Sequence, residues 1–119
     1  MRNSRLINYV SKMTDPQIAA YHVKHMSKLL HYWKYLYYHC SVSIVTDFQF
    51  DRLFQALEII EEKFPELVVE TSPTKVVGWN KEAFPEVAAL EFDKEQAIMM
   101  FLYPVFVPDE KLKWGVRNG

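Results

Sequence analysis

The sequence holds one cysteine, almost no net charge and no long hydrophobic run, and each shortage excludes a class of protein. Cys40 alone cannot form an internal disulfide, which is typical of the reducing cytoplasm, where we expect this protein to reside. With 14 basic and 15 acidic residues the net charge is −1, so no overall field attracts nucleic acid and no direct nucleic-acid binding is expected. The most apolar run, Ala97–Val107, contains Pro104 and is far shorter than the roughly 20 residues of a membrane-spanning helix. The polar N-terminus predicts no signal peptide, and no membrane association is expected.

Residues suited to metal binding or nucleophilic catalysis are also scarce. His22 and His25 have a helical spacing that could bind a metal, but no third ligand is indicated, so we predict no metal site. Cys40 has no identifiable base partner, and we interpret it as a small buried hydrophobic residue. We therefore predict no catalytic residue in this chain.

The composition is that of one small domain, residues 1–119, with a mostly α (α+β) fold. Half of the residues are hydrophobic and 15% are aromatic, which is ample material for a core. A long helix is predicted from Gln17 to about His39, capped by Thr14 or Asp15 and begun by Pro16. Its apolar stripe consists of Ile18, His22, Met26, Leu29, Trp33, Leu36 and Cys40. Such a helix is too long for a domain this small to bury throughout, so part of it should project or meet a partner.

A short connector, which includes Ser41–Val45, leads to a second predicted helix. Thr46 and Gln49 form a capping-box pattern, the helix runs from Asp47 to about Lys63, and Pro65 ends it. Its predicted buried face consists of Phe50, Leu53, Leu57, Ile60 and Phe64. The residues predicted to stay in solvent are Arg52, Glu58, Glu61, Glu62 and Lys63.

The remaining segments carry weaker patterns. Met1–Met13 is read either as a short helix or as a loose arm. Val76–Trp79 can be a strand or a packed loop, and Phe84–Leu90 is predicted as a further short strand. A third helix is expected over Lys94–Tyr103, and residues 105–119 show no clear period.

The most informative stretch is the end of the first helix and the start of the second. Tyr37 and Tyr38 close the first helix, and Asp47, Phe50 and Asp51 lie at i, i+3 and i+4 on one face of the second. In the plain interpretation the two acids only stabilise a helix N-terminus and the tyrosines only pack. In the sharper one, aromatic faces and carboxylates meet across a crevice that suits a pyridinium ring, with about 0.5–2 kcal/mol of cation–π attraction per ring face.

Residues 35–78 read YLYYHCSVSIVTDFQFDRLFQALEIIEEKFPELVVETSPTKVVG. This stretch resembles the N-terminal domain of bacterial NAD-dependent DNA ligases. The shared pattern is Tyr-x-Tyr-Tyr/His, a connector, Asp-x-x-Tyr-Asp-Arg-Leu, a helix, Pro-Glu-Leu and Ser-Pro-Thr-x-x-Val-Gly. The positions that match it are Tyr37, Tyr38, Asp47, Asp51, Arg52, Leu53, Pro65, Glu66, Leu67, Ser72, Pro73, Thr74, Val77 and Gly78. The resemblance covers residues 29–78 and leaves 79–119 as an unassigned extension.

The resemblance implies that the domain binds the nicotinamide mononucleotide (NMN) half of NAD. Tyr37 and Phe50 would then sandwich the nicotinamide, Asp51 would meet the carboxamide, and Tyr38 and Asp47 would reach the ribose and phosphate. Phe50 departs from the tyrosine of the pattern, keeping the stacking face but losing a hydroxyl, so weaker or altered binding is expected.

A second departure concerns catalysis. The Lys-x-Asp-Gly motif, whose lysine becomes adenylated in these ligases, is missing, and Lys75–Gly78 lies in the Ser-Pro-Thr turn without the aspartate. We therefore expect that this chain alone does not join DNA. Three interpretations stay open: an NMN-binding subunit that works with a separate adenylyltransferase chain, an NMN-binding or decoy module that regulates a partner by contact, and a scaffold that has lost its ligand.

Overall fold

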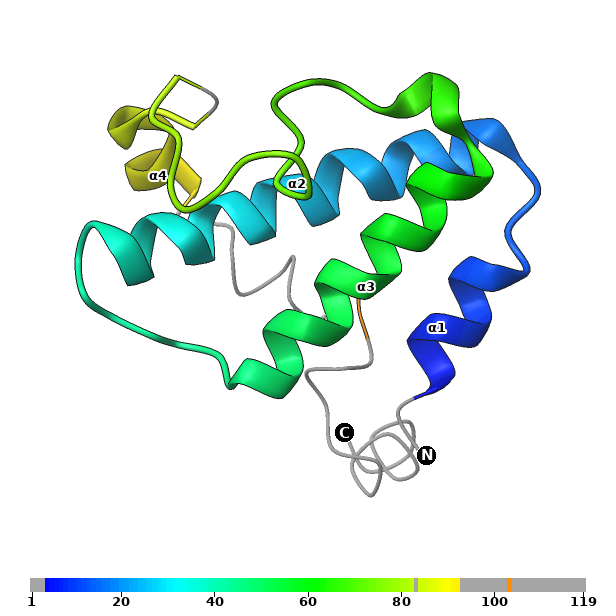
Figure 1. The fold of residues 1–119 in the computed structure, drawn as a ribbon, viewed down its shortest axis with the longest axis horizontal. Helices are drawn as coiled ribbons and strands as arrows, with labels where there is room; N and C mark the ends of the chain where they lie inside the picture. The colour runs from blue at the N-terminus through cyan, green and yellow to red at the C-terminus, as the bar shows by residue number, and fades with distance from the viewer. Residues whose placement is uncertain (1–3, 83, 93–102, 104–119) are drawn as a thin grey trace.

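The computed structural model describes residues 4–82, 84–92 and 103, and its described part is helical (Figure 1). In chain order, the elements of the described residues are α1, α2, α3, the 3₁₀ turn η1, and α4. Their bounds are Ser4–Ser11, Pro16–Tyr38, Asp47–Lys63, Pro65–Leu67 and Glu86–Phe92. In the described part of Met1–Met13, Ser4–Ser11 is thus a helix and not a loose arm.

The capping signals of the two main helices are confirmed. Asp15, not Thr14, caps α2: its carboxylate accepts from the backbone N–H of Gln17 at 2.9 Å, and Pro16 takes the first helical position. Thr46 and Gln49 form the reciprocal capping box of α3, with bonds of 2.9 and 3.1 Å. Local chemistry therefore sets where both helices begin.

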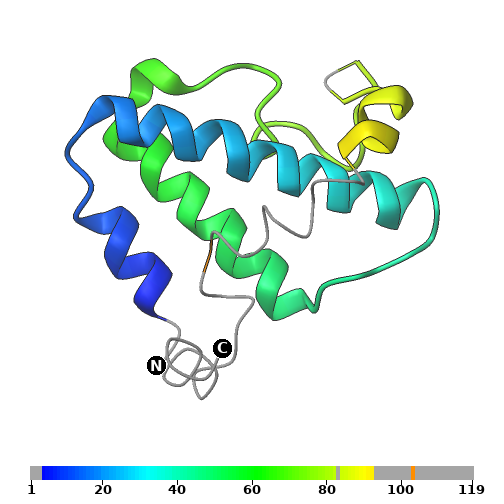
Figure 2. The ribbon, with the colours of Figure 1, turned by 180° about the vertical axis from the view of Figure 1, so that it is seen from behind.

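The core forms where α3 packs between α2 and α1 (Figures 1 and 2). Its fully buried side chains include Leu6, Val10, Met26, Leu29, Leu30, Leu53, Leu57 and Ile60. The predicted α2 stripe holds from His22 to Trp33, whereas Ile18 and Cys40 at its two ends are exposed. The part of α2 that projects is its last turn, where Tyr37 and Tyr38 are each 60% exposed.

The predicted short strands are wrong for the described residues, none of which lies in a strand. Val76–Trp79 is a loop in which Val77 is exposed and Trp79 is partly buried, and α4 occupies most of the segment predicted as a strand over Phe84–Leu90. The helical outcome has a physical reason, because Glu86, the two alanines and Leu90 all have high helix propensity. The third helix expected over residues 94–103 lies outside the described residues except for Tyr103.

For two side chains, the burial predicted from the sequence is wrong. Glu61 was predicted in solvent but is only 6% exposed, because the later loop that contains Ser72 and Thr74 packs against it. The hydroxyls of Ser72 and Thr74 each donate a hydrogen bond to its carboxylate at 2.6 Å. Cys40, predicted as buried, is exposed because α2 ends at Tyr38 and the chain leaves the core there. Among the described residues, no helix is both long and apolar enough to cross a membrane.

Candidate functional site

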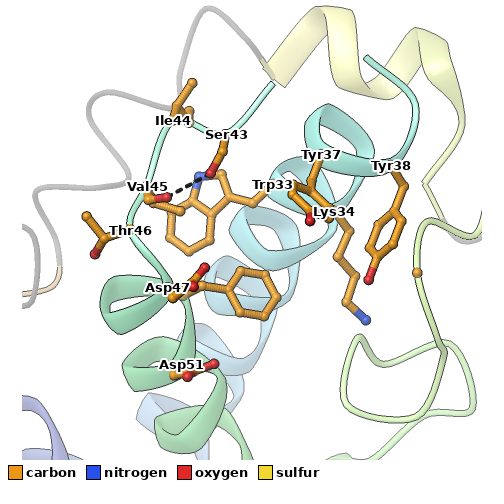
Figure 3. Close-up of a pocket in the computed structure, with 12 residues that line it drawn as sticks. Trp33, Lys34, Tyr37, Tyr38, Ser43, Ile44, Val45, Thr46, Asp47 and Asp51 are labelled. Carbon is orange, nitrogen blue, oxygen red and sulfur yellow. Dashed lines mark hydrogen bonds between the residues drawn. The ribbon is translucent and has the colours of Figure 1, made fainter. Parts of the chain in front are cut away.

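A cleft of about 300 Å³ opens between the end of α2 and the start of α3 (Figure 3). Its α2 wall consists of Trp33, Lys34, Tyr37 and Tyr38. The opposite wall is formed by Asp47, Phe50 and Asp51 of α3, the connector residues 43–46 close one end, and Gly78 approaches from a later loop. The volume lies at the lower end of the range for small-molecule pockets.

All five residues selected from the sequence line this one cleft: Tyr37, Tyr38, Asp47, Phe50 and Asp51. Helical geometry explains why, since side chains four residues apart share a face. Tyr37 lies one turn beyond Trp33, Tyr38 lies one turn beyond Lys34, and the connector turns α3 back toward these rows. The structure thus brings the five together, while their role in binding a ligand stays a prediction.

The aromatic rings of the cleft differ in how firmly they are held. Phe50 is partly buried, with its ring centroid 6.1 Å from that of Trp33 and 6.0 Å from that of Phe54, on which it stacks at 25°. Tyr37 and Tyr38 are exposed and meet edge to face at 5.0 Å. A flat ligand would therefore find one fixed ring on the α3 side and accessible tyrosine rings on the α2 side.

The acidic wall has a local origin. Asp47 is the first residue of α3, where the partial positive charge of a helix N-terminus favours carboxylates, and Asp51 follows one turn later on the same face. Both side chains are exposed, so helix stabilisation does not prevent them from accepting hydrogen bonds from a ligand. Ionised carboxylates form charge-assisted bonds with amide and hydroxyl donors.

Gly78 reaches the cleft because the loop before it is bonded to both helices. His31 Nε2 donates to Thr71 O at 2.9 Å, and Lys34 Nζ donates to Pro73 O and Val76 O at 2.7 and 2.8 Å. The Ser-Pro-Thr hydroxyls bond Glu61 of α3 as described above. Gly78 adopts φ +65°, and a Cβ built on it would lie 3.9 Å from ring carbons of Tyr38. The backbone here covers one side of the Tyr38 ring.

Comparison with known proteins decides the family. Residues 16–78, more than half of the chain, match the family described as DNA ligase-like, N-terminal NAD+-binding domain. The chain belongs to this family. The match contains α2, the connector, α3 and the loop to Gly78, and so includes every residue that lines the cleft.

Similar curated proteins of this family are bacterial DNA ligases. One from Neisseria meningitidis serogroup C is 35% identical over 96 residues, which are 80% of this chain and 11% of the ligase. One from Gloeobacter violaceus is 33% identical over 109 residues, 91% of this chain and 15% of the ligase. One from Saccharophagus degradans is 47% identical over 49 residues, 41% of this chain and 7% of the ligase. This chain thus spans roughly a tenth of the length of such relatives, and no solved structure gave a match.

The structure adds cleft residues of this NAD+-binding domain that sequence reasoning missed, namely Trp33, Lys34, Gly78 and the connector residues 43–46. The sequence pattern places Trp33 only in the apolar stripe of the first helix and does not single out Lys34. Their signal was the spacing of four to Tyr37 and Tyr38. Lys34 is 6% exposed, and burial lowers the pKa of its ammonium group.

The histidines of this ligase-like domain have structural partners. The ring nitrogens of His22 form hydrogen bonds with the hydroxyls of Tyr9 and Tyr103, each at 3.1 Å. Burial lowers the pKa of His22, and the nearby His25 lowers it further by charge repulsion. Over residues 4–82, 84–92 and 103, the structure brings no three His, Cys, Asp or Glu side chains into an arrangement that could hold a metal ion. His22 therefore belongs to the packing between α1, α2 and Tyr103.

Proposed function

We propose that this chain binds the NMN half of NAD in the cleft between α2 and α3. One observation carries the proposal: exposed tyrosines from one helix, and a fixed phenylalanine with two carboxylates from the next, line a single cleft. The cationic nicotinamide ring would lie between Tyr37 and Phe50, where cation–π attraction is about 0.5–2 kcal/mol per face. Asp51 would accept from the carboxamide, and Tyr38 and Asp47 would reach the ribose and phosphate side of the ligand, where the Asp47 carboxylate can accept from a ribose hydroxyl.

At the level of the assembly, we propose an NMN-binding subunit of a split NAD-dependent DNA ligase. A separate adenylyltransferase chain would supply the nucleophilic lysine and take the AMP half of NAD. This chain would hold and orient NMN as the leaving group, and orientation of a bound group alone contributes to catalysis. Family membership supports this role, because the similar ligases carry the same domain within one chain.

A second candidate is a ligase-like module that regulates a partner by contact, without catalysis. The observation that favours it is the exposure of two large apolar side chains that neighbour cleft residues in sequence: Phe48, next to Asp47, is 50% exposed, and Val77, next to Gly78, is 96% exposed. Exposed apolar side chains of this kind are suited to contact with a partner protein. In this alternative the chain would dock on a ligase without contributing to adenylation.

Ligand binding is tested by calorimetric titration of the protein with NMN and NAD, using AMP as the ligand control. We expect saturable binding of NMN, weakened about 10-fold or more in Asp51→Ala, because one charge-assisted hydrogen bond is lost. Glu58→Ala is the matched control, since Glu58 is an exposed acid of the same helix outside the cleft. Absence of NMN binding, or an equal loss in both variants, would overturn the proposed site.

The subunit role is tested by adding the chain to a bacterial DNA ligase that lacks its own N-terminal NAD+-binding domain. Formation of the ligase–AMP adduct from NAD should be restored by the native chain and not by Asp51→Ala. If the chain instead lowers adduct formation by an intact ligase and restores nothing in the truncated one, the regulatory alternative replaces the subunit role.

A further inference from the structure

Lys34 is a buried cation in the wall of the cleft. Its side chain is 6% exposed, yet it lines the cleft, and its ammonium donates to the carbonyl oxygens of Pro73 and Val76. An ammonium group carries three N–H donors, so these two bonds leave one donor over. Within the part of the chain that the structure describes, no carboxylate pairs with it. Burying an ammonium group without a counter-ion costs free energy, so binding of an anion beside this lysine would be favourable.

The two walls of the cleft carry opposite charge. In Figure 3, Lys34 runs along the α2 side, whereas Asp47 and Asp51 stand on the α3 side. NMN carries opposite charges at its two ends, a pyridinium ring and a phosphate monoester. A pyridinium beside the buried ammonium would be repelled, whereas the reverse orientation pairs each end of the ligand with the opposite charge. The charge arrangement of the cleft therefore fits one direction of such a ligand.

We propose that Lys34 donates its remaining N–H to the phosphate of the bound mononucleotide and so sets the ligand's direction in the cleft. The inference rests on the proposed function and adds a phosphate-contacting residue to it. Tyr38, one turn further along α2, flanks the same side of the cleft. Because Lys34 also holds the loop that carries Gly78, phosphate binding and the position of that loop would be linked through one side chain.

The test compares NMN with nicotinamide riboside, which is the same molecule without the phosphate. For the native protein we expect NMN to bind about 10-fold or more tightly than the riboside, with a preference that falls as salt is added. In Lys34→Met the affinity for NMN should fall about 10-fold or more beyond any fall in the affinity for the riboside, so that this preference nearly disappears. Lys75→Met is the matched control, since Lys75 is an exposed lysine of the same loop, and it should keep the preference.

The outcomes separate the two proposals. Equal affinity of the native protein for NMN and the riboside would overturn the role of Lys34 and leave the nicotinamide site standing. Equal weakening of both ligands in Lys34→Met would assign Lys34 to loop positioning alone and overturn phosphate contact. If neither ligand binds the native protein, the proposed function itself fails. If Lys34→Met does not fold, the native-protein comparison can still overturn the role of Lys34, because equal affinity for NMN and the riboside excludes a phosphate contact.

Discussion

Glu61 offers the sharpest test of how this domain holds its cleft together. Its carboxylate is buried in α3 and accepts hydrogen bonds from the hydroxyls of Ser72 and Thr74, both at 2.6 Å. These bonds attach the loop that ends at Gly78. Replacing Glu61 by alanine removes both acceptors and leaves the two hydroxyls beside an apolar gap.

The size of the effect follows from these two bonds. A hydrogen bond to a charged group contributes about 1.5–3 kcal/mol. The two bonds share one acceptor, so their contributions do not simply add, and the alanine also relieves the desolvation of a buried carboxylate. We expect a net loss of about 2–4 kcal/mol, which for a chain of this length corresponds to a fall in Tm of roughly 8–16 °C.

Urea denaturation followed by circular dichroism measures this loss, with Glu62→Ala as the control because Glu62 is exposed. The control should stay within about 0.5 kcal/mol of the native protein. Thr74→Val should be clearly destabilising in the native background and nearly neutral in Glu61→Ala, since its bonding partner is then already absent. A Glu61→Ala protein as stable as Glu62→Ala would refute the reasoning, and so would additive effects of the Glu61 and Thr74 changes.

Two further predictions concern the same loop. Gly78→Ala should lower the free energy of unfolding by about 1–2 kcal/mol, measured by thermal unfolding, because φ +65° is unfavourable for a residue with a Cβ. Gly78→Asn should lower it less, since asparagine tolerates this conformation better. Equal losses in the two variants would instead assign the effect to contact with the Tyr38 ring. Burial, and less so Lys34, lowers the pKa of His31 below 6.5 despite the bond to Thr71 O. As the pH falls, His31 therefore becomes protonated at a higher pH in the unfolded chain than in the folded one. Its contribution to stability is present above about pH 6.5 and is lost as the pH falls through the lowered pKa of the folded state. The Tm difference between pH 7.5 and 5 should shrink in His31→Gln; an unchanged difference would contradict this assignment.

Boundaries of the two main helices could be predicted because their signals are local. Asp15, Pro16 and Thr46 act on backbone groups within a few residues of themselves, so they operate before any tertiary contact forms. The periodic apolar residues between them define the buried faces in the same way. The short strand predicted over Phe84–Leu90 failed because a short apolar segment does not distinguish a strand from a helix packed on α2.

The residues of the candidate site that share one face of a helix could be predicted from the sequence. Tyr37 with Tyr38, and Asp47 with Phe50 and Asp51, share faces that the sequence displays directly. Glu61 was predicted in solvent and Lys34 was not singled out, because their partners lie 11 to 42 residues away along the chain. From the sequence alone a charged side chain is predicted to be exposed to solvent, because its hydrogen-bond partners from distant segments are not known.

By itself, the sequence determined the two main helices, the connector between them and the set of aromatic and acidic residues that face each other. It could do so because helix caps and helical spacing depend on neighbours in the chain. Only the tertiary structure decided that a later loop returns to complete the cleft and that a lysine is buried in its wall. Those features depend on hydrogen bonds between distant segments, and such bonds exist only once the helices have packed.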